Sequence, residues 1–305
     1  MTRILVAGLI NIETTLRVDG FPIPYAPVHY PFFGVNSSVS GVGYNVAKAL
    51  TTLGDEVQFL SLVGQDLAGA SVEATLRAER IAGDHVLRAI PHTAQSVILY
   101  EPGGRRQIHV DLKDIQERTY PAARFQTVLT GCDLAVLCNA NFTRPFLGMA
   151  REAGKLIASD VHAISSLDDD YNRDYMQAAD ILFMSDERLP VAPEEWAQAV
   201  IARYSPQILV IGLGAQGALL AVPRDGFMAR WPAVFTRPVV NTIGAGDALF
   251  SAFVHSYAAE PDPYRALRRA MVFASYKIGA TSAADGFLTT EALDRLVAAS
   301  AFDVG

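Results

Sequence analysis

The stretch "NTIGAGDALFSAF" (residues 241–253) places two glycines and a carboxylate between a β-rich segment and an apolar helical pattern. Backbone N–H groups at the start of a helix attract anions, so a glycine-rich turn at this point is typical of a phosphate-binding site. Asp247 would repel a phosphate unless it had a chemical role. The stretch therefore predicts a strand-to-helix turn that combines an anion site with an acid–base group.

Two familiar phosphate loops do not fit this turn. A P-loop ends in Gly-Lys-Ser/Thr, which the chain lacks, and a dinucleotide fingerprint needs a small residue where this chain has Leu249. A third reading is a helix start whose amides neutralise a phosphoryl group in transfer. These amides belong to Gly244, Ala245 and Gly246. Asp247 then takes the proton of the attacking alcohol, unless it only caps an ordinary turn.

Composition excludes several classes of protein. The 305 residues, 50% of them hydrophobic, suffice for one large α/β domain. A net charge of −7 leaves no basic field for a nucleic-acid partner. The apolar run at residues 4–10 is too short to cross a bilayer, so we expect no membrane partner and a cytoplasmic location. Cys132 and Cys138 are predicted to be buried core residues.

Apolar β-type runs alternate with helical patterns, which predicts βα units around a mostly parallel sheet. The predicted strands are 3–8, 57–64, 134–139, 155–160, 181–185 and 208–214, and the clearest helices are 43–53, 68–78 and 193–204. Two segments break the alternation: the proline-rich residues 12–39, and residues 96–112, where two extended runs flank a Pro-Gly-Gly turn. These segments predict a small sheet outside the main one.

The opening stretch also resembles the C-terminal signature of the ribokinase-like (PfkB) carbohydrate kinases, Asp-Thr-x-Gly-Ala-Gly-Asp. Other segments resemble the same family in order and spacing, so the likeness covers nearly the whole chain. They are "GLINIE" (8–13), similar to Gly-x-x-Asn-x-Asp; "SGVGYNVAKALTTLG" (40–54), similar to the glycine-rich substrate loop; "LSLVGQDLAG" (60–69); and "VIGLGAQGALL" (210–220).

The resemblance implies a fold and an activity. The fold is a three-layer ribokinase-like α/β domain spanning residues 1–305, with a mostly parallel central sheet flanked by helices. A small β-sheet lid is expected from about residues 12–39 and 94–120. The activity is transfer of the γ-phosphate of ATP, carried with Mg²⁺, to a hydroxymethyl group of a sugar or nucleoside. Pairing of lids in the family implies a homodimer.

The resemblance also assigns site residues. Those implied for the acceptor are Asn11, Glu13, Gly41, Gly43 and Asn45, with the two glycines letting a polar ligand approach the backbone. Asn141 joins them because ligands bind beyond the carboxyl ends of strands, and His109 and His162 are further candidates. Those implied for ATP are Ser185, Gly212, Gly214, Gly217, Thr242 and Ser275.

The chain departs from the family pattern in four places. Glu13 stands where the family has Asp, and Ser40 replaces a glycine. Asn241 replaces an acid that in relatives helps to bind a monovalent cation, so dependence on such a cation is left open. The family's Asn-x-x-Glu falls at "SDER" (185–188), which leaves open the residues that organise Mg²⁺.

The sequence leaves two alternatives to a general sugar kinase, the first of which follows from the departures at Asn241 and at residues 185–188. One is a catalytically weak homologue that senses a sugar or nucleoside, although a sensor has no need of the intact Asp247. The other is a pseudouridine-type kinase, because "GVGYNVA" (41–47) is similar to the loop of that branch with Tyr44 in place of an arginine. The sequence does not select among pentoses, hexoses and nucleosides.

Overall fold

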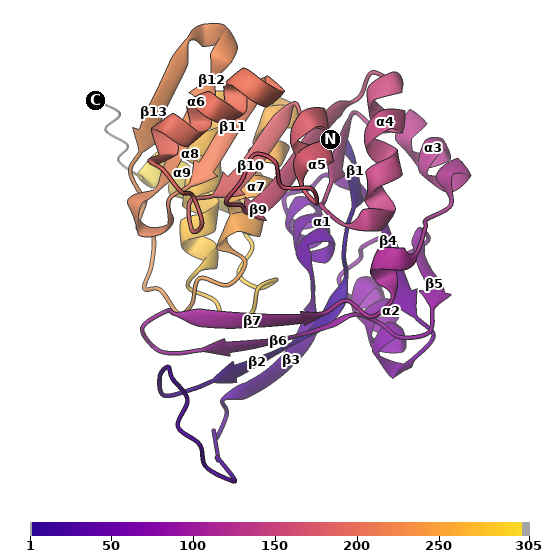
Figure 1. Ribbon diagram of the computed structural model, residues 1–305, viewed down its shortest axis with the longest axis vertical. Coiled ribbons are helices and arrows are strands. Elements are labelled where there is room, and N and C mark those ends of the chain that lie inside the picture. Colours follow the sequence, from indigo (N-terminus) through magenta and orange to yellow (C-terminus); the bar gives the residue numbers. More distant parts are fainter. Residues whose placement is uncertain (1, 301–305) are drawn as a thin grey trace.

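A computed structural model describes residues 2–300 of the chain. Within these residues a nine-stranded sheet has the order β13-β12-β11-β10-β9-β8-β1-β4-β5 (Figure 1). Neighbouring strands are parallel except at β12, which is antiparallel to both of its neighbours. The strands are β1 (Arg3–Ala7), β4 (Glu56–Gly64), β5 (Val86–Ile90), β8 (Leu134–Leu137), β9 (Leu156–Ala163), β10 (Ile181–Ser185), β11 (Ile208–Gly212), β12 (Ala218–Val222) and β13 (Phe227–Trp231).

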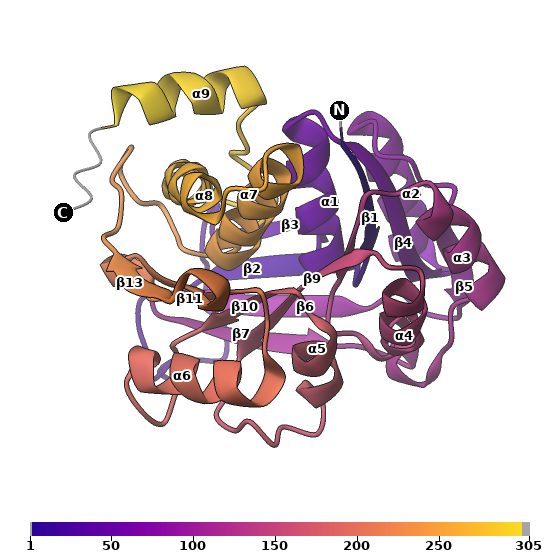
Figure 2. The same ribbon diagram turned by 90° about the horizontal axis from the view of Figure 1, so that it is seen from above.

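Helices cover both faces of this sheet, which gives three layers (Figure 2). One face carries α1 (Val42–Thr52), α2 (Leu67–Ala78), α7 (Ala245–Ala259) and α8 (Pro263–Lys277), with α9 (Thr290–Ala299) outside α8. The other carries α3 (Ala122–Thr130), α4 (Arg144–Glu152), α5 (Arg173–Ala178) and α6 (Pro193–Tyr204). Successive residues of a strand point to opposite faces. Accordingly, Ile4 and Val6 belong to one core, and Leu5 and Ala7 to the other.

A second, four-stranded sheet lies across one end of the large sheet (Figure 1). Its order is β3-β2-β6-β7, and its strands are β2 (Asn11–Arg17), β3 (Val35–Ser40), β6 (Gln95–Tyr100) and β7 (Arg106–Asp111). The β6–β7 pair is the hairpin predicted over residues 96–112. The chain enters this sheet after β1 and again after β5. It leaves the sheet after β3, into α1, and after β7, into the short helix η1 (Ile115–Glu117).

The order of the large sheet fixes where a ligand can bind. β1 lies between β4 and β8, so the chain moves away from β1 in two directions. In open α/β sheets, ligands bind beyond the carboxyl ends of the strands at such a reversal. The small sheet lies at this edge, and Asn11 begins β2 only a few residues after β1 ends.

The predicted fold class is confirmed. The six predicted strands and three predicted helices are present, with bounds that differ by at most three residues. Both cysteines are buried and unpaired, as predicted. No helix among residues 2–300 combines the length and apolar composition needed to span a bilayer.

Candidate active site

The turn at residues 241–247 begins α7 and opens toward the exterior. Gly244 is the N-cap residue with a left-handed φ of 73°, and a Cβ there would lie 2.6 Å from the carbonyl oxygen of Ala283. Only glycine fits both constraints. Gly246 is exposed, and a Cβ on it would meet no atom within 4 Å. The first amides of a helix have no intrahelical acceptor, and here the amide of Ala245 donates to the Thr242 carbonyl oxygen at 3.2 Å.

Asp247 is connected to the small sheet by a chain of hydrogen bonds. The Nδ2 atom of Asn45, in the first turn of α1, donates to Asp247 Oδ2 at 2.7 Å. Ser40 Oγ lies 3.3 Å from Asn45 Oδ1 and 3.1 Å from Glu13 Oε2. Ser40, Asn45 and Glu13 are buried, whereas Asp247 is half-buried. The structure therefore links the predicted base to the predicted acceptor residues.

Burial controls the charge of both carboxyl groups. It raises the pKa of Asp247, and the charge of Asp160 adds to this rise. The same pKa is lowered by His162, the Asn45 amide and Lys277, which offset part of the rise. Burial also raises the pKa of Glu13. A carboxylate with a raised pKa holds a proton more strongly, which is the property required of a general base for an alcohol.

Two buried oxygen atoms near this chain have no hydrogen-bond partner among the described residues. They are Asn11 Oδ1 and Glu13 Oε1. Both residues lie on β2 two positions apart, so they share one face of the small sheet. The Nδ2 atom of Asn11 donates to Ser96 Oγ at 3.1 Å, which fixes the orientation of this amide with its oxygen unpaired. A buried acceptor without a partner is unfavourable, so both oxygens are available to accept hydrogen bonds from a bound molecule.

The glycines of the predicted substrate loop serve backbone packing. A Cβ at Gly41 would lie 2.7 Å from the Leu9 carbonyl oxygen, and Gly41 has a φ of 103°. A Cβ at Gly43 would lie 2.5 Å from the carbonyl carbon of Gly8. These glycines let α1 approach the end of β1, and their contact with an acceptor stays a prediction. Their packing brings Asn45 within reach of Asp247.

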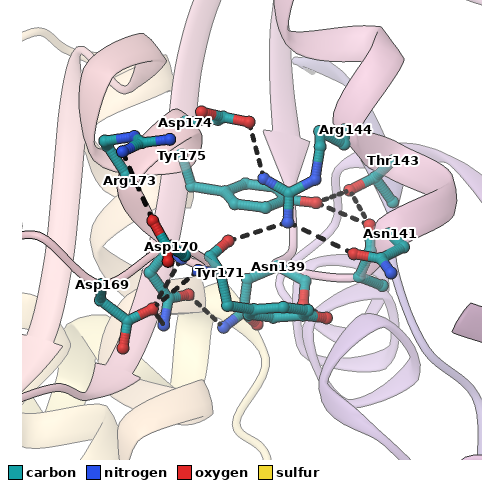
Figure 3. Close-up of polar contacts among 12 residues, drawn as sticks. Asn139, Asn141, Thr143, Arg144, Asp169, Asp170, Tyr171, Arg173, Asp174 and Tyr175 are labelled. Atoms are coloured by element: carbon teal, nitrogen blue, oxygen red, sulfur yellow. Dashed lines mark hydrogen bonds and ion pairs between the residues drawn. The ribbon is translucent and has the colours of Figure 1, made fainter.

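Asn141 belongs to a polar network beside the site (Figure 3). Its backbone N–H donates to Gln116 Oε1 at 3.2 Å, and its Nδ2 donates to the Gln116 carbonyl oxygen at 3.1 Å. Its Oδ1 accepts from Arg144, whose guanidinium lies 5.4 and 5.1 Å from the ring centres of Tyr171 and Tyr175. In this state Asn141 anchors η1, where the chain leaves the small sheet, and its contact with an acceptor stays a prediction.

The residues predicted to border ATP lie at the carboxyl ends of β10 and β11 and beside α8. Ser185 and Gly212 are paired in adjacent strands. The turn at Gly214 is exposed, and Gly217 is held against the Trp231 carbonyl oxygen with no room for a Cβ. Ser275 is buried and accepts a hydrogen bond from the Thr236 amide at 3.0 Å, so it positions the segment that leads to Thr242.

Two cationic side chains that the sequence analysis did not select meet the turn. Arg106, on β7, donates to Thr242 Oγ1 and to Glu187 Oε1, each at 3.0 Å. Lys277, the last residue of α8, is fully buried and donates to the Ile243 carbonyl oxygen. A lysine inside the apolar pattern of "MVFASYKIG" (271–279) was a usable signal for Lys277. For Arg106 the sequence carries no such signal.

Of the two candidate histidines, only His162 lies near the base. His162 is half-buried at the end of β9, where its backbone N–H donates to Asp160. His109 is exposed and is paired with Val97 across the small sheet. Alternation along β7 puts His109 on the face opposite to Glu13 and Ser96.

Residues 1–290 match the profile of the pfkB family carbohydrate kinases. The chain belongs to this family. A curated relative, the ATP-dependent ribose-1-phosphate kinase of Halopiger xanaduensis, is 27% identical over 274 residues, covering 88% of this chain and 90% of the relative. The acarbose 7(IV)-phosphotransferase of an Actinoplanes species is 25% identical over 90% of this chain and 91% of its own. A solved microbiome-derived acarbose kinase superposes with a TM-score of 0.87 at 25% identity, covering 97% of this chain and 99% of that chain.

Family membership confirms the resemblance read from the sequence and settles the class of protein. This PfkB carbohydrate kinase is an ATP-dependent phosphotransferase that acts on an alcohol group of a sugar or nucleoside. In this geometry an acid next to a helix start is connected to buried side chains, two of whose oxygen atoms have no hydrogen-bond partner among the described residues.

Proposed function

We propose that Asp247 is the general base and that the helix start at residues 244–246 binds the γ-phosphoryl group of ATP. The supporting observation is the hydrogen bond of Asn45 to Asp247, because it orients one carboxylate oxygen and leaves the half-buried group able to accept a proton. The acceptor hydroxyl transfers its proton to Asp247 as its oxygen attacks the phosphorus atom. The bond from this phosphorus to the bridging oxygen of ADP breaks, and the amides neutralise the transferring group.

The acceptor that fits this site is a molecule with neighbouring hydroxyl groups. Asn11 Oδ1 and Glu13 Oε1 both lack a donor, and they lie on the same face of β2. Two hydroxyl groups on adjacent carbons can donate to both oxygens. A third hydroxyl group, that of a hydroxymethyl substituent, is then left for Asp247. We therefore place a polyhydroxylated sugar ring against β2.

Magnesium enters the proposal with the phosphates of ATP, whose charge it neutralises. Within residues 2–300 no group of three or more His, Cys, Asp and Glu side chains could hold a metal by itself. Asp186 and Glu187 follow the end of β10, and Glu187 is connected to Thr242 through Arg106. These two acids fit a metal whose remaining ligands are phosphate oxygens and water. ATP itself is placed along Ser185, Gly212, Gly214 and Gly217.

A panel of acceptors tests the substrate class. Coupled assays of ATP consumption are run with pentoses, ribose 1-phosphate, fructose, acarbose and nucleosides including pseudouridine, since relatives are named for several of these. We expect stimulation by at least one polyol and none by alcohols with a single hydroxyl group. Stimulation by pseudouridine alone would select the nucleoside-specific alternative. If no acceptor stimulates ATP use, the sensing homologue is favoured instead.

Replacing the base tests the mechanism. Asp247→Ala is expected to fold and bind ATP, and to lose about three decades of kcat, because a positioned base contributes roughly 10²–10⁴-fold. The control is Glu291→Ala, which removes another first-turn carboxylate, from α9. Steady-state kinetics and isothermal titration of ATP measure the two effects. Turnover near that of the unaltered enzyme in Asp247→Ala would overturn the mechanism.

We further propose that the small sheet is a lid and that two copies of the chain pair through it. The supporting observation is apolar exposure on β6 and β7, where Val97, Ile108 and Val110 are about half exposed. A lid over the acceptor excludes water that would otherwise hydrolyse ATP. The cytoplasmic location stays a prediction of the sequence.

A further inference from the structure

Lys277 is a buried cation that the proposed mechanism does not use. Lysine side chains are almost never fully buried unless they are paired, yet Lys277 has no exposed surface. Its Nζ atom donates to the carbonyl oxygen of Ile243, which immediately precedes the anion-binding amides. A cation in this position therefore binds the backbone of the turn itself.

The charges around Lys277 come from several elements. Asp247 on α7, Glu13 on β2 and Asp285 favour its charged form, and Arg237 opposes it. Burial outweighs these carboxylates and lowers the pKa of Lys277 to about 8. At neutral pH the side chain is therefore an ammonium ion that interacts with two carboxyl groups of the site, those of Asp247 and Glu13.

The planarity of the peptide bond gives Lys277 a geometric role. In a trans peptide the C=O and the following N–H point in opposite directions, and the single cis peptide among the described residues joins Phe21 and Pro22. The carbonyl of Ile243 points inward to Lys277. The N–H of Gly244, in the same peptide plane, must point away from Lys277, and the hydrogen bond on the carbonyl polarises this N–H further.

The surroundings of Asn241 do not fit a bound monovalent cation. Such a cation needs oxygen ligands, and the family resemblance places an acid at this position. Here Asn241 Nδ2 donates to the carbonyl oxygens of Ala280 and Thr281, at 3.2 and 2.8 Å. Asn241 Oδ1 accepts from the Ile243 amide at 3.0 Å. The carbonyl oxygens that could serve as ligands are already bound by nitrogen donors, namely this amide and Lys277.

We propose that Lys277 is the built-in cation of the anion-binding turn, a positioning residue that replaces a bound monovalent cation by fixing the peptide between Ile243 and Gly244. The proposal rests on the proposed kinase function. It predicts an enzyme that needs no potassium or other monovalent metal ion, and a turn that loses its orientation when the ammonium group is removed.

The unaltered enzyme provides the first test. Its kcat is measured with the best acceptor in tetramethylammonium buffer, with and without added K⁺, Na⁺ or NH₄⁺. We expect changes below about twofold, because the site already contains its cation. Activation of about tenfold or more by K⁺ would overturn the inference while leaving the kinase function intact. Absence of ATP turnover with every acceptor would instead contradict the proposed function.

Variants provide the second test. Lys277→Met keeps the length of the side chain and removes its charge. It is expected to lower kcat by about tenfold or more, with a smaller change in KM for the acceptor, because a donor for the transition state is misplaced. The acid limb of the kcat/KM profile should also move to higher pH, because Lys277 lowers the pKa of Asp247. His162 and Asn45 lower this pKa as well, whereas Asp160 raises it. A structural lysine would not move this limb.

The matched control is Lys155→Met. Lys155 also donates to a backbone carbonyl, that of Cys132 at 2.6 Å, but it lies before the amino end of β9, away from the site. The smaller variant Lys277→Ala is assayed with methylammonium or ammonium, which should restore part of the lost rate. A folded Lys277→Met enzyme with unchanged kcat and pH profile would overturn the inference. If the variants do not fold, the cation series on the unaltered enzyme decides.

Discussion

Ser40 and Glu13 depart from the family pattern at two positions that contact each other. Ser40 Oγ is within hydrogen-bond distance of two acceptors, Glu13 Oε2 at 3.1 Å and Asn45 Oδ1 at 3.3 Å. A hydroxyl group has one proton to donate. The hydroxyl can therefore donate to only one of these acceptors at a time, and burial raises the pKa of the Glu13 partner. The orientation of the Asn45 amide toward Asp247 then depends on the pair.

We predict that Ser40 and Glu13 are energetically coupled. Ser40→Ala should lower kcat/KM for the acceptor by about tenfold, since a buried hydrogen bond contributes roughly 1 kcal/mol and its loss leaves Asn45 Oδ1 unpaired. Glu13→Gln should lower kcat/KM when it is made alone, but should cause little further loss in the Ser40→Ala background, because the effects of residues in one network do not add. Ser37→Ala is the control, because Ser37 bonds Thr14 on the exposed side of the same strands. Additive losses in the double-mutant cycle would contradict the coupling.

The raised pKa of Asp247 has consequences for activity and stability. The base must be ionised, so kcat/KM should fall as pH drops through a value above the ordinary aspartate range near 4. A folded-state pKa above the unfolded value means that stability from this group is complete at low pH and is lost as pH rises through the folded pKa. At pH 7, Asp247→Asn should therefore unfold at the same or a higher temperature while losing activity. Calorimetric scans at pH 5 and 7 measure this, and clear destabilisation at pH 7 would count against a buried carboxylate maintained for catalysis.

At the scale of elements, β7 connects the small sheet to the turn before α7. Arg106 bridges Thr242 and Glu187, two segments that are far from β7 in the sequence. A guanidinium group presents several donors in a fixed plane, which suits simultaneous contact with a hydroxyl and a carboxylate. We expect the same group to contact phosphate oxygens if ATP binds at this turn.

We therefore predict that Arg106→Ala raises KM for ATP and lowers kcat, with a combined loss in kcat/KM of about 10- to 100-fold, the range of a hydrogen bond to a charged group. Arg106→Lys should recover only part of this, because it keeps the charge and not the fork. Arg105→Ala is the matched control, since its neighbouring guanidinium pairs with Glu101 within the hairpin. Equal kinetics for Arg105→Ala and Arg106→Ala would exclude a role for Arg106 at the turn.

The elements themselves were predictable, and several contacts between them were not. Buried parallel strands read as continuous apolar runs, which is why β1, β8, β10 and β11 were found from the sequence. The turn at Asp247 carries its own chemical signal in glycines and an acid. Arg106 carries none, because an arginine in an exposed hairpin looks like any solvated residue until the fold brings Thr242 to it. The contacts of Ser40 carry no sequence signal either, because its two partners come from different elements.

At the scale of the whole molecule, the site joins parts of the chain that are distant in sequence. Asn45 and Asp247 are 202 positions apart, and Arg106 and Thr242 are 136 apart. The large sheet makes these contacts possible, because the carboxyl ends of its parallel strands point toward the end of the sheet that the small sheet crosses (Figure 1). Two cores, one on each face, hold this edge in place. The turn before α7 is therefore anchored to a well-packed part of the molecule.

The small sheet and its long loop expose a concentration of apolar side chains. Phe32 is 84% exposed and Phe33 is completely exposed, and Tyr25, Val28 and Tyr30 lie in the same loop between β2 and β3. Large exposed apolar patches mark interaction sites. A closed pair of identical chains buries such a surface in both copies at once.

We predict that light scattering after size exclusion gives the mass of a dimer, and that the double variant Phe32→Ser and Phe33→Asn gives a monomer. Asparagine suits position 33 because Phe33 has a positive φ of 56°, which asparagine tolerates better than phenylalanine. Phe235→Ser is the control, since Phe235 is 77% exposed in a loop outside the lid. Circular dichroism should be unchanged in all variants, because none of these side chains belongs to either core. A monomeric mass for the unaltered protein at its highest soluble concentration would contradict pairing through the lid, and the exposed aromatics would then have to serve the acceptor or another partner.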